Sequence, residues 1–156
     1  MPTAQPSPAA RFAELLSRFP PEIVALTKKC MPKVRRVLPG AIELVYDYSK
    51  SVVVSFSMSG KGYEGILALA IYADKVQLYF GAGKSLPDPK GLLQGSGSLV
   101  RSLTLAAASD LDHPDIRALI DAAIAQAGVT LPGAGRARMI IMSTTNSRRT
   151  SKAGRK

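Results

Sequence analysis

The residues of this chain best suited to chemistry are cations around a glycine-rich segment. Successive glycines and serines can turn several backbone N–H groups toward one side and so form an anion-binding nest. The candidate site joins such a segment with three basic side chains near it in the sequence: Gly95, Ser96, Gly97, Lys84, Lys90 and Arg101. This pattern predicts a site for a phosphate or a carboxylate. The alternative is a tight turn in which the glycines supply positive φ angles.

A second glycine-rich segment, Gly81–Ser85, ends in the Gly-Lys-Ser of a phosphate-binding loop. That loop also needs a glycine five positions before the glycine that precedes the lysine, and a helix after the serine. The earlier position holds Leu78, inside an apolar stretch, and Pro87 and Pro89 follow the serine. Because these prolines prevent a helix from starting there, the sequence excludes a nucleotide-binding loop of this type.

Acidic side chains form a second cluster. Three aspartates and a histidine lie close together in the sequence and could be metal ligands: Asp110, Asp112, His113 and Asp115. The same residues suit a helix start in which Asp112 is the cap, Pro114 lies in the first turn and Asp115 faces the positive helix end. We favour the helix start and predict no metal site. Four other polar side chains flank the entry to the first expected strand and could line a cleft, although no spacing rule singles them out: Glu43, Tyr46, Asp47 and Tyr48.

The cysteine and histidine counts exclude several classes of protein. A single cysteine, Cys30, cannot form a disulfide within the chain, and a single histidine, His113, cannot complete a Cys/His zinc site with it. A Ser-His-Asp triad would have to use His113. Cys30 lies on the apolar stripe of an expected helix, which indicates an inert buried thiol rather than a nucleophile. We identify no catalytic constellation and no cofactor motif, and we favour a protein that is not an enzyme.

Positive charge is concentrated in two parts of the chain. The formal net charge is +10, and residues 133–156 carry seven Arg and Lys and no acid, including Arg148 and Arg149. A second group lies on one face of an expected helix: Lys28, Lys29, Lys33, Arg35 and Arg36. Both groups are interpreted first as solvated basic surface. The alternative is sequence-independent attraction to nucleic acid or, for the tail, also to an anionic membrane.

Two helices are expected near the N-terminus and one near the C-terminus. Ser7 and Pro8 are suited to cap and start the first, in which apolar residues follow at helical spacing. Pro21 can start the second, and Pro32 inside it predicts a kink or break near Met31. The last helix has apolar side chains from Ile116 to Ala127 at helical spacing, and Gly128 ends it.

Four strands are expected between these helices. Apolar and polar residues alternate over 51–58, which indicates a strand with one buried face. A continuous apolar run over 66–73 and a short apolar run over 76–80 indicate two further strands. A tight turn separates these two, so we expect them to form a hairpin. A long Gly/Pro loop covers 81–97, and a fourth strand follows over 101–106. The predicted class is α+β: an antiparallel sheet with the N-terminal helices and the C-terminal helix packed on one face.

The chain is expected to hold one domain. We predict a flexible N-terminus over 1–9, a single domain over 10–131, and a basic, disordered tail over 132–156. Within that tail, Met139–Met142 is apolar, and it either docks on the body or is an apolar bead in a disordered arm. No secretion signal is visible, and the longest apolar run is far short of the roughly 20 residues that span a bilayer. We therefore expect a cytoplasmic protein with no membrane span.

The order of several motifs resembles that of a known family. The segments that carry the resemblance are Leu38–Asp47, Lys61–Gly65, Val76–Phe80 and Leu86–Gly97 with Arg101. Together they resemble the YdhG-like family of bacterial domains of unknown function, over about residues 10–128. The most specific part is the loop from Pro-Asp-Pro to Gly-Ser-Gly. The resemblance implies a small α+β fold with helices packed on an antiparallel sheet, and it implies no known reaction.

One branch of that family is similar in fold to frataxin, and the resemblance implies iron delivery through an acidic surface on the first helix. This chain departs from that pattern, because its first two helices carry only Glu14 and Glu22 as acids among many basic groups. Iron ions prefer carboxylate oxygen, and a basic face repels them. A frataxin-like iron-binding chaperone is thus a disfavoured alternative, using Asp110, Asp112 and Asp115 or Glu43 and Asp47.

These observations lead to one expected function and two alternatives. The expected function is a non-enzymatic binding protein for a small anionic ligand or an acidic protein partner. The first alternative is non-specific association with nucleic acid through the basic tail and the basic helix face. The second is the iron chaperone. The oligomeric state is not predicted.

Overall fold

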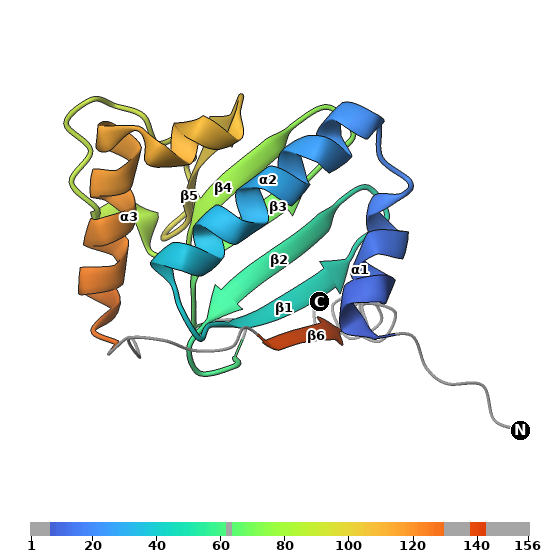
Figure 1. Ribbon diagram of the computed structural model, residues 1–156. Helices are drawn as coiled ribbons and strands as arrows, with labels where there is room; N and C mark the ends of the chain where they lie inside the picture. The colour runs from blue at the N-terminus through green and yellow to red at the C-terminus, as the bar shows by residue number, and fades with distance from the viewer. Residues whose placement is uncertain (1–6, 62–63, 130–137, 143–156) are drawn as a thin grey trace, which may run out of the picture.

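The computed structural model describes residues 7–61, 64–129 and 138–142. Within these residues, a six-stranded sheet has helices on one face (Figure 1). The elements in chain order are α1 (Pro8–Leu16), α2 (Pro21–Val37), β1 (Ile42–Asp47), β2 (Val52–Ser57), β3 (Gly65–Ile71), β4 (Val76–Phe80), the short 3₁₀ helix η2 (Gly83–Ser85), β5 (Arg101–Leu105), the 3₁₀ helix η3 (Ala108–Asp112), α3 (Pro114–Ala127) and β6 (Arg138–Met142). The α+β class predicted from the sequence is confirmed.

The strands lie in the order β5-β4-β3-β2-β1-β6. From β1 to β5 each strand pairs antiparallel with the next along the chain, and β6 pairs parallel with β1. The predicted hairpin is present as β3 and β4, closed by a bond of 2.9 Å from the Tyr72 N–H to the Lys75 carbonyl. The sequence prediction missed β1, which precedes the first expected strand.

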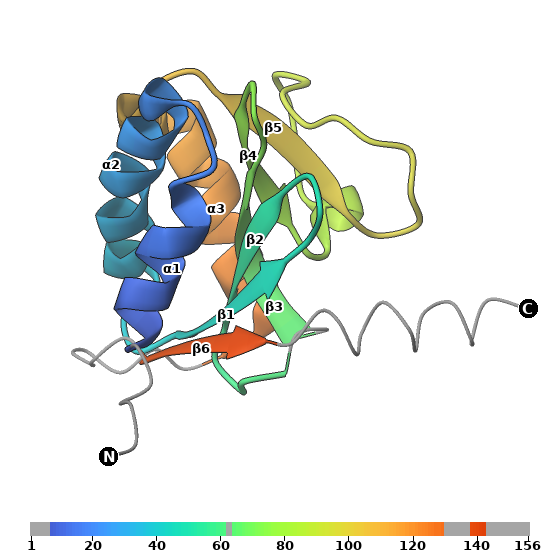
Figure 2. The ribbon, with the colours of Figure 1, turned by 90° about the vertical axis from the view of Figure 1, so that its right-hand side faces the viewer.

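The three helices lie on the same side of the sheet (Figure 2). The long segment between η2 and β5 passes beside the start of α3, where Lys90 pairs with Asp115, and its end reaches the open face through Val100. The side chains of each strand alternate between the two faces of the sheet, and this alternation explains which of them form the core. Val52, Val54 and Phe56 of β2 are fully buried toward the helices, with Leu69 and Ile71 of β3 beside them. Because successive side chains of a strand point to opposite faces, the intervening residues form an open face that no described helix covers.

α1 and α2 begin at Pro8 and Pro21, as the sequence predicts. The Ser7 hydroxyl caps α1 by accepting a hydrogen bond of 3.1 Å from the Ala10 N–H. α2 continues through Pro32, so the helix does not break near Met31. Pro32 is exposed, and the carbonyl left without its bond belongs to Lys28, which is also exposed, so water can satisfy that carbonyl. Met31 is buried and holds this part of α2 on the sheet.

α3 ends as predicted but begins with a different cap. His113, rather than Asp112, is the N-cap, and its Nδ1 accepts a hydrogen bond of 3.2 Å from the Asp115 N–H. Asp112 instead forms an ion pair with Lys33 of α2, a contact between helices that sequence spacing does not reveal. Gly128 ends the helix with a φ of 68°, a left-handed conformation that favours glycine.

Part of the expected tail is structured. Arg138–Met142 form β6 at the edge of the sheet, so the alternative in which Met139–Met142 dock on the body is the one that the structure shows. Met139 and Ile141 pack against the core from this edge. The other residues of the expected tail, and most of the expected flexible N-terminus, lie outside the described residues. No helix among those described has the length and apolar character that crossing a bilayer requires.

Candidate binding groove on the open sheet face

Side-chain size varies across the open face in a regular way. Two adjacent rows of paired residues cross it: Leu44, Ser55, Ala68, Tyr79 and Ser102 in one, and Tyr46, Val53, Ala70, Gln77 and Thr104 in the other. The central strands β2 and β3 carry small side chains, whereas β1 and β4 carry Tyr46 and Tyr79. The two tyrosine-bearing strands are three strand spacings apart, or about 14 Å. The face is therefore hollowed along β2 and β3.

This hollow has a volume of about 560 Å³, within the range of small-molecule sites. All four tyrosines that the structure describes line it, namely Tyr46, Tyr48, Tyr72 and Tyr79. Its floor is formed by Val53, Ser55, Ala68 and Ala70. We call this feature the tyrosine groove. Tyr63 lies outside the described residues.

Tyrosine hydroxyls of the groove form hydrogen bonds with their neighbours. The hydroxyls of Tyr72 and Tyr79 lie 3.1 Å apart, and that of Tyr79 also donates to Gln77 Oε1 at 3.1 Å. Burial, and then the hydrogen bond with Tyr79, raise the pKa of Tyr72 to about 12. Burial, and then the neighbouring Tyr48, raise the pKa of Tyr46. Phenols with raised pKa values stay protonated near neutral pH, so they can donate hydrogen bonds but cannot act as bases.

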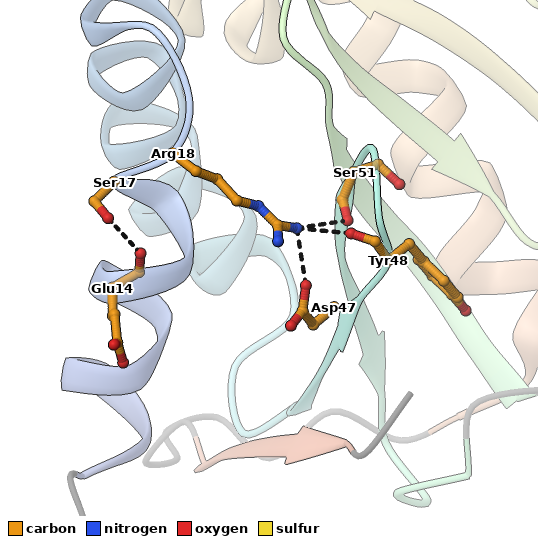
Figure 3. A network of polar contacts seen from close by, with 6 residues as sticks. All are labelled: Glu14, Ser17, Arg18, Asp47, Tyr48 and Ser51. Atoms are coloured by element: carbon orange, nitrogen blue, oxygen red, sulfur yellow. Dashed lines mark hydrogen bonds and ion pairs between the residues drawn. The ribbon is translucent and has the colours of Figure 1, made fainter. Parts of the chain in front are cut away.

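One end of the groove is held by an arginine from the helical layer (Figure 3). Arg18 Nη2 donates to the carbonyls of Tyr48 at 2.7 Å and Ser51 at 3.3 Å, and it forms an ion pair of 2.8 Å with Asp47. These contacts fix the turn between β1 and β2. The Tyr48 ring points away from Arg18 (Figure 3), stacks with Tyr46 at 6.1 Å between ring centroids, and is 43% exposed.

The segment between η2 and β5 contributes to the groove through Val100. Arg101 Nη1 donates to the carbonyls of Gly97 at 2.7 Å and Val100 at 2.8 Å, so this guanidinium holds the segment in place. Gln94 and Ser102 exchange two backbone hydrogen bonds of 2.7 and 2.9 Å across the same segment. The end of this loop is thus fastened to β5.

The residues of the predicted anion site are divided between two places. Gly95 and Gly97 lie against Arg101. Gly95 has a φ of 131°, which agrees with the alternative interpretation of this segment as a tight turn with positive φ angles. Lys90 is directed elsewhere, since its ammonium lies 3.7 Å from Asp115 in the first turn of α3. The Lys84 backbone N–H donates to the Leu99 carbonyl. Ser96 is exposed. The anion site as a whole stays a prediction.

The basic face of α2 lies in the helical layer, on the other side of the sheet from the groove. Two of its five cations are paired, Lys33 with Asp112 and Arg35 with Glu43. Three others have no ion pair with any described residue: Lys28, Lys29 and Arg36. Arg148 and Arg149 lie outside the described residues. Association of nucleic acid with these groups also stays a prediction.

The acidic residues considered as metal ligands have local partners. Asp110 accepts hydrogen bonds from the backbone of Ala106 and Ala107 at 2.8 and 3.2 Å. The hydrogen bond from Lys33 is the main cause that lowers the pKa of Asp112. Among the residues that the structure describes, no group of three or more His, Cys, Asp and Glu is arranged to hold a metal ion.

Cys30 is fully buried beside the core. Burial raises the pKa of its thiol from 9.0 to about 11, with a smaller contribution from Asp110 in the same direction. A thiol that stays protonated and lies away from water is a poor nucleophile. The burial expected from the sequence is confirmed.

Sequence reasoning found part of the groove without its shape. The sequence predicts that Tyr46 and Tyr48 line a possible cleft, and it does not connect Tyr72 and Tyr79 with them. The available signal was the alternation in β4, which places Gln77 and Tyr79 on the face opposite Leu78. The register that brings Tyr79 level with Ser55 and Ala68 is not visible in the sequence.

Comparison of the chain with protein-family models, with curated proteins and with solved structures found no significant match in any of the three. The resemblance to the YdhG-like family therefore stays a prediction, and the functional argument depends on the described residues themselves.

Proposed function

We propose that this protein is a non-enzymatic binding protein, and that its tyrosine groove holds a small anionic ligand with a flat aromatic part. One observation carries the proposal: all four described tyrosines surround a floor of small side chains on a sheet face that no described helix covers. Aromatic rings attract other rings in stacked or edge-to-face arrangements, and the small floor leaves room for one.

The anionic part of the proposal follows from charge. None of the described residues that line the groove is acidic. Cations lie at its margin: the Lys75 ammonium is 5.4 Å from the centre of the Tyr72 ring, and Arg101 binds the carbonyl of the groove residue Val100. The whole chain carries a formal charge of +10, which attracts anions over longer distances. Four of the six residues of the predicted anion site, Gly95 to Gly97 and Arg101, adjoin this margin.

Binding is proposed rather than catalysis because the described residues that line the groove include no carboxylate, imidazole, amine or thiol. Its polar side chains are tyrosine and serine hydroxyls. The pKa values of Tyr46 and Tyr72 are raised, so neither supplies a phenolate base. A serine would need an adjacent base to become a nucleophile, and the part of the groove lining that the structure describes holds no such side chain.

Calorimetry with 2-naphthoate tests this proposal, with cyclohexanecarboxylate and inorganic phosphate as anions that lack the flat ring. Ala68→Leu fills the floor of the groove from its open side. Thr104→Leu places the same leucine side chain on the same sheet face, outside the groove lining. We expect 2-naphthoate to bind the original chain and the Thr104→Leu variant, and not the Ala68→Leu variant. Equal binding to both variants, or equal affinity for all three anions, would contradict the proposal.

A further inference from the structure

We infer that the tyrosine groove binds single-stranded nucleic acid, with bases stacked on the tyrosine rings and phosphates near the cations at the groove margins. The inference rests on the proposed function, because it names the class of anionic aromatic ligand that occupies the same groove. Bases are flat rings and the backbone is anionic, so one polymer has both properties that the groove favours. Aromatic side chains on an open sheet face are a general means of holding unpaired bases.

The groove is long enough for more than one base. The lining residues of the groove run from Gly65 to Tyr72 along β3, so the groove extends about 20 Å along the strands. Stacked bases are about 3.4 Å apart along one strand. Tyr48 and Tyr72 lie in or beside the turns at one end, while Tyr46 and Tyr79 stand at opposite sides of the floor. Rings are thus available at several points along a bound strand.

Cations occur at both ends of the groove. The turns between β1 and β2 and between β3 and β4 are at the same end of the sheet and carry Lys50 and Lys75. Lys61 follows β2 at the other end, and Arg101 lies at the start of β5 on that side. Three acidic residues lie near the ends, Asp47, Asp74 and Glu64, and Asp47 is paired with Arg18.

Charge also favours single-stranded nucleic acid over two other possible occupants of the groove, a second copy of the chain and a basic peptide. A second copy of the chain would bring a formal charge of +10 against another +10, which opposes association. A basic peptide would find no acidic side chain among the described residues of the groove lining. A polyanion with aromatic rings meets neither obstacle. Duplex DNA hides the faces of its bases in the stack, so the tyrosines would favour a single strand.

The first experiment measures anisotropy of a labelled 12-nucleotide oligothymidylate with the full chain, beside the corresponding duplex and thymidine 5′-monophosphate. Because the chain has no tryptophan, its intrinsic emission comes from tyrosine, and four of its five tyrosines surround the groove. We expect the single strand to bind more tightly than the duplex at equal salt and to quench tyrosine emission. Tyr79→Leu should weaken binding about tenfold or more, whereas Tyr79→Phe, which keeps the ring, should not.

The second experiment separates the groove from the basic face of α2. The plot of log affinity against log salt has a negative slope, and each phosphate contact to a single strand contributes about −0.7 to it. Loss of one such contact therefore makes the slope less steep by about 0.7. The double variant Lys50→Ala/Lys75→Ala should therefore reduce the slope by about 1.4. Lys28→Ala/Lys29→Ala removes the same charge from the opposite layer and should leave it unchanged. The reverse result would place the polymer on α2 and overturn the inference.

The two proposals can fail separately. If 2-naphthoate binds and Ala68→Leu abolishes that binding, while the oligonucleotide neither quenches tyrosine emission nor responds to Tyr79→Leu, the inference fails and the proposed function stands. If the groove variants change the binding of neither 2-naphthoate nor the oligonucleotide, both the inference and the proposed function fail. Oligothymidylate that binds no more tightly than its duplex also overturns the inference. Thermal unfolding of each variant confirms that the altered chains are folded.

Discussion

Arg35 and Glu43 form a two-point ion pair between α2 and β1. Arg35 Nε donates to Glu43 Oε2 at 2.7 Å and its Nη2 donates to Oε1 at 2.9 Å. Glu43 is 1% exposed, on the helix-facing side of the sheet, so its charge lies away from water. The sequence suggested other roles for both residues, Arg35 in a basic surface and Glu43 at a cleft. The pair instead joins the helical layer to the sheet.

Loss of one partner of this pair is expected to destabilise the fold. Arg35→Leu leaves the buried Glu43 carboxylate without its counter-ion and should lower the free energy of unfolding by about 3 kcal/mol. Lys29→Leu, on an exposed part of the same helix, should change it by less than about 0.5 kcal/mol. Urea unfolding measures both. The double variant Arg35→Leu/Glu43→Leu should recover much of the loss, and equal effects at Arg35 and Lys29 would show that the pair contributes little.

Alkaline pH is expected to destabilise the protein partly through Tyr72. Its pKa is about 12 in the folded chain against 10.0 as the ordinary value, so the folded state holds the proton more tightly than the unfolded state. The resulting stabilisation is fully present below pH 10 and is lost as the pH rises from 10 toward 12. The free energy of unfolding of the Tyr72→Phe variant should therefore fall less steeply over this interval than that of the original chain. Parallel curves would contradict the role of Tyr72.

Gly81 is expected to tolerate no side chain. A Cβ added there would lie 2.4 Å from the Gly65 carbonyl oxygen, a backbone atom at the start of β3 that cannot move aside cheaply. Gly81→Ala should lower the free energy of unfolding by about 1–3 kcal/mol through overpacking. Gly97 is the matched control, because an added Cβ meets nothing within 4 Å. If both variants unfold at the same urea concentration, the close approach of Gly81 to β3 is wrong.

Cys30 is expected to react with thiol reagents only after the chain opens. Its side chain is fully buried, and its pKa is raised to about 11. In native buffer at pH 8 a disulfide reagent should therefore label it far more slowly than in denaturant. The measurement is the absorbance of the released thiolate over time. Labelling at the same rate under both conditions would show that the thiol is accessible in the folded protein.

Substitutions of Arg101 and Lys90 are expected to differ in their effect on proteolysis of the loop before β5, although the sequence predicts that both residues belong to one anion site. Arg101→Ala removes the donor that binds two carbonyls of the loop before β5, so limited proteolysis should cut within 86–100 more rapidly. Lys90→Ala removes an exposed pair with Asp115 and should leave the rate of cleavage near that of the original chain. If neither variant changes the cleavage, Arg101 does not hold the loop. If both weaken binding of the same anion, the predicted site regains support.

Local signals in the sequence determined the helices, the class of fold and the charge. Ser7 with Pro8 and Gly128 mark helix ends through interactions within a few residues, and alternation over 51–58 marks a strand through its own two faces. Such signals need no distant partner, because capping and side-chain periodicity depend on neighbours along the chain. The inert environment of Cys30 followed from the same periodicity.

Only the tertiary structure decided the site. Tyr46 and Tyr79 belong to strands that do not pair with each other, and they enclose a common floor because the registers of β1 to β4 align them with Val53, Ser55, Ala68 and Ala70. Strand β6 joins the sheet beside β1, almost a hundred residues earlier in the chain. Pairings of this kind depend on which faces must be buried against the helices, and a shift of one residue would reverse every side chain of a strand. The sequence therefore contains the tyrosines, and the packing of the sheet makes them a groove.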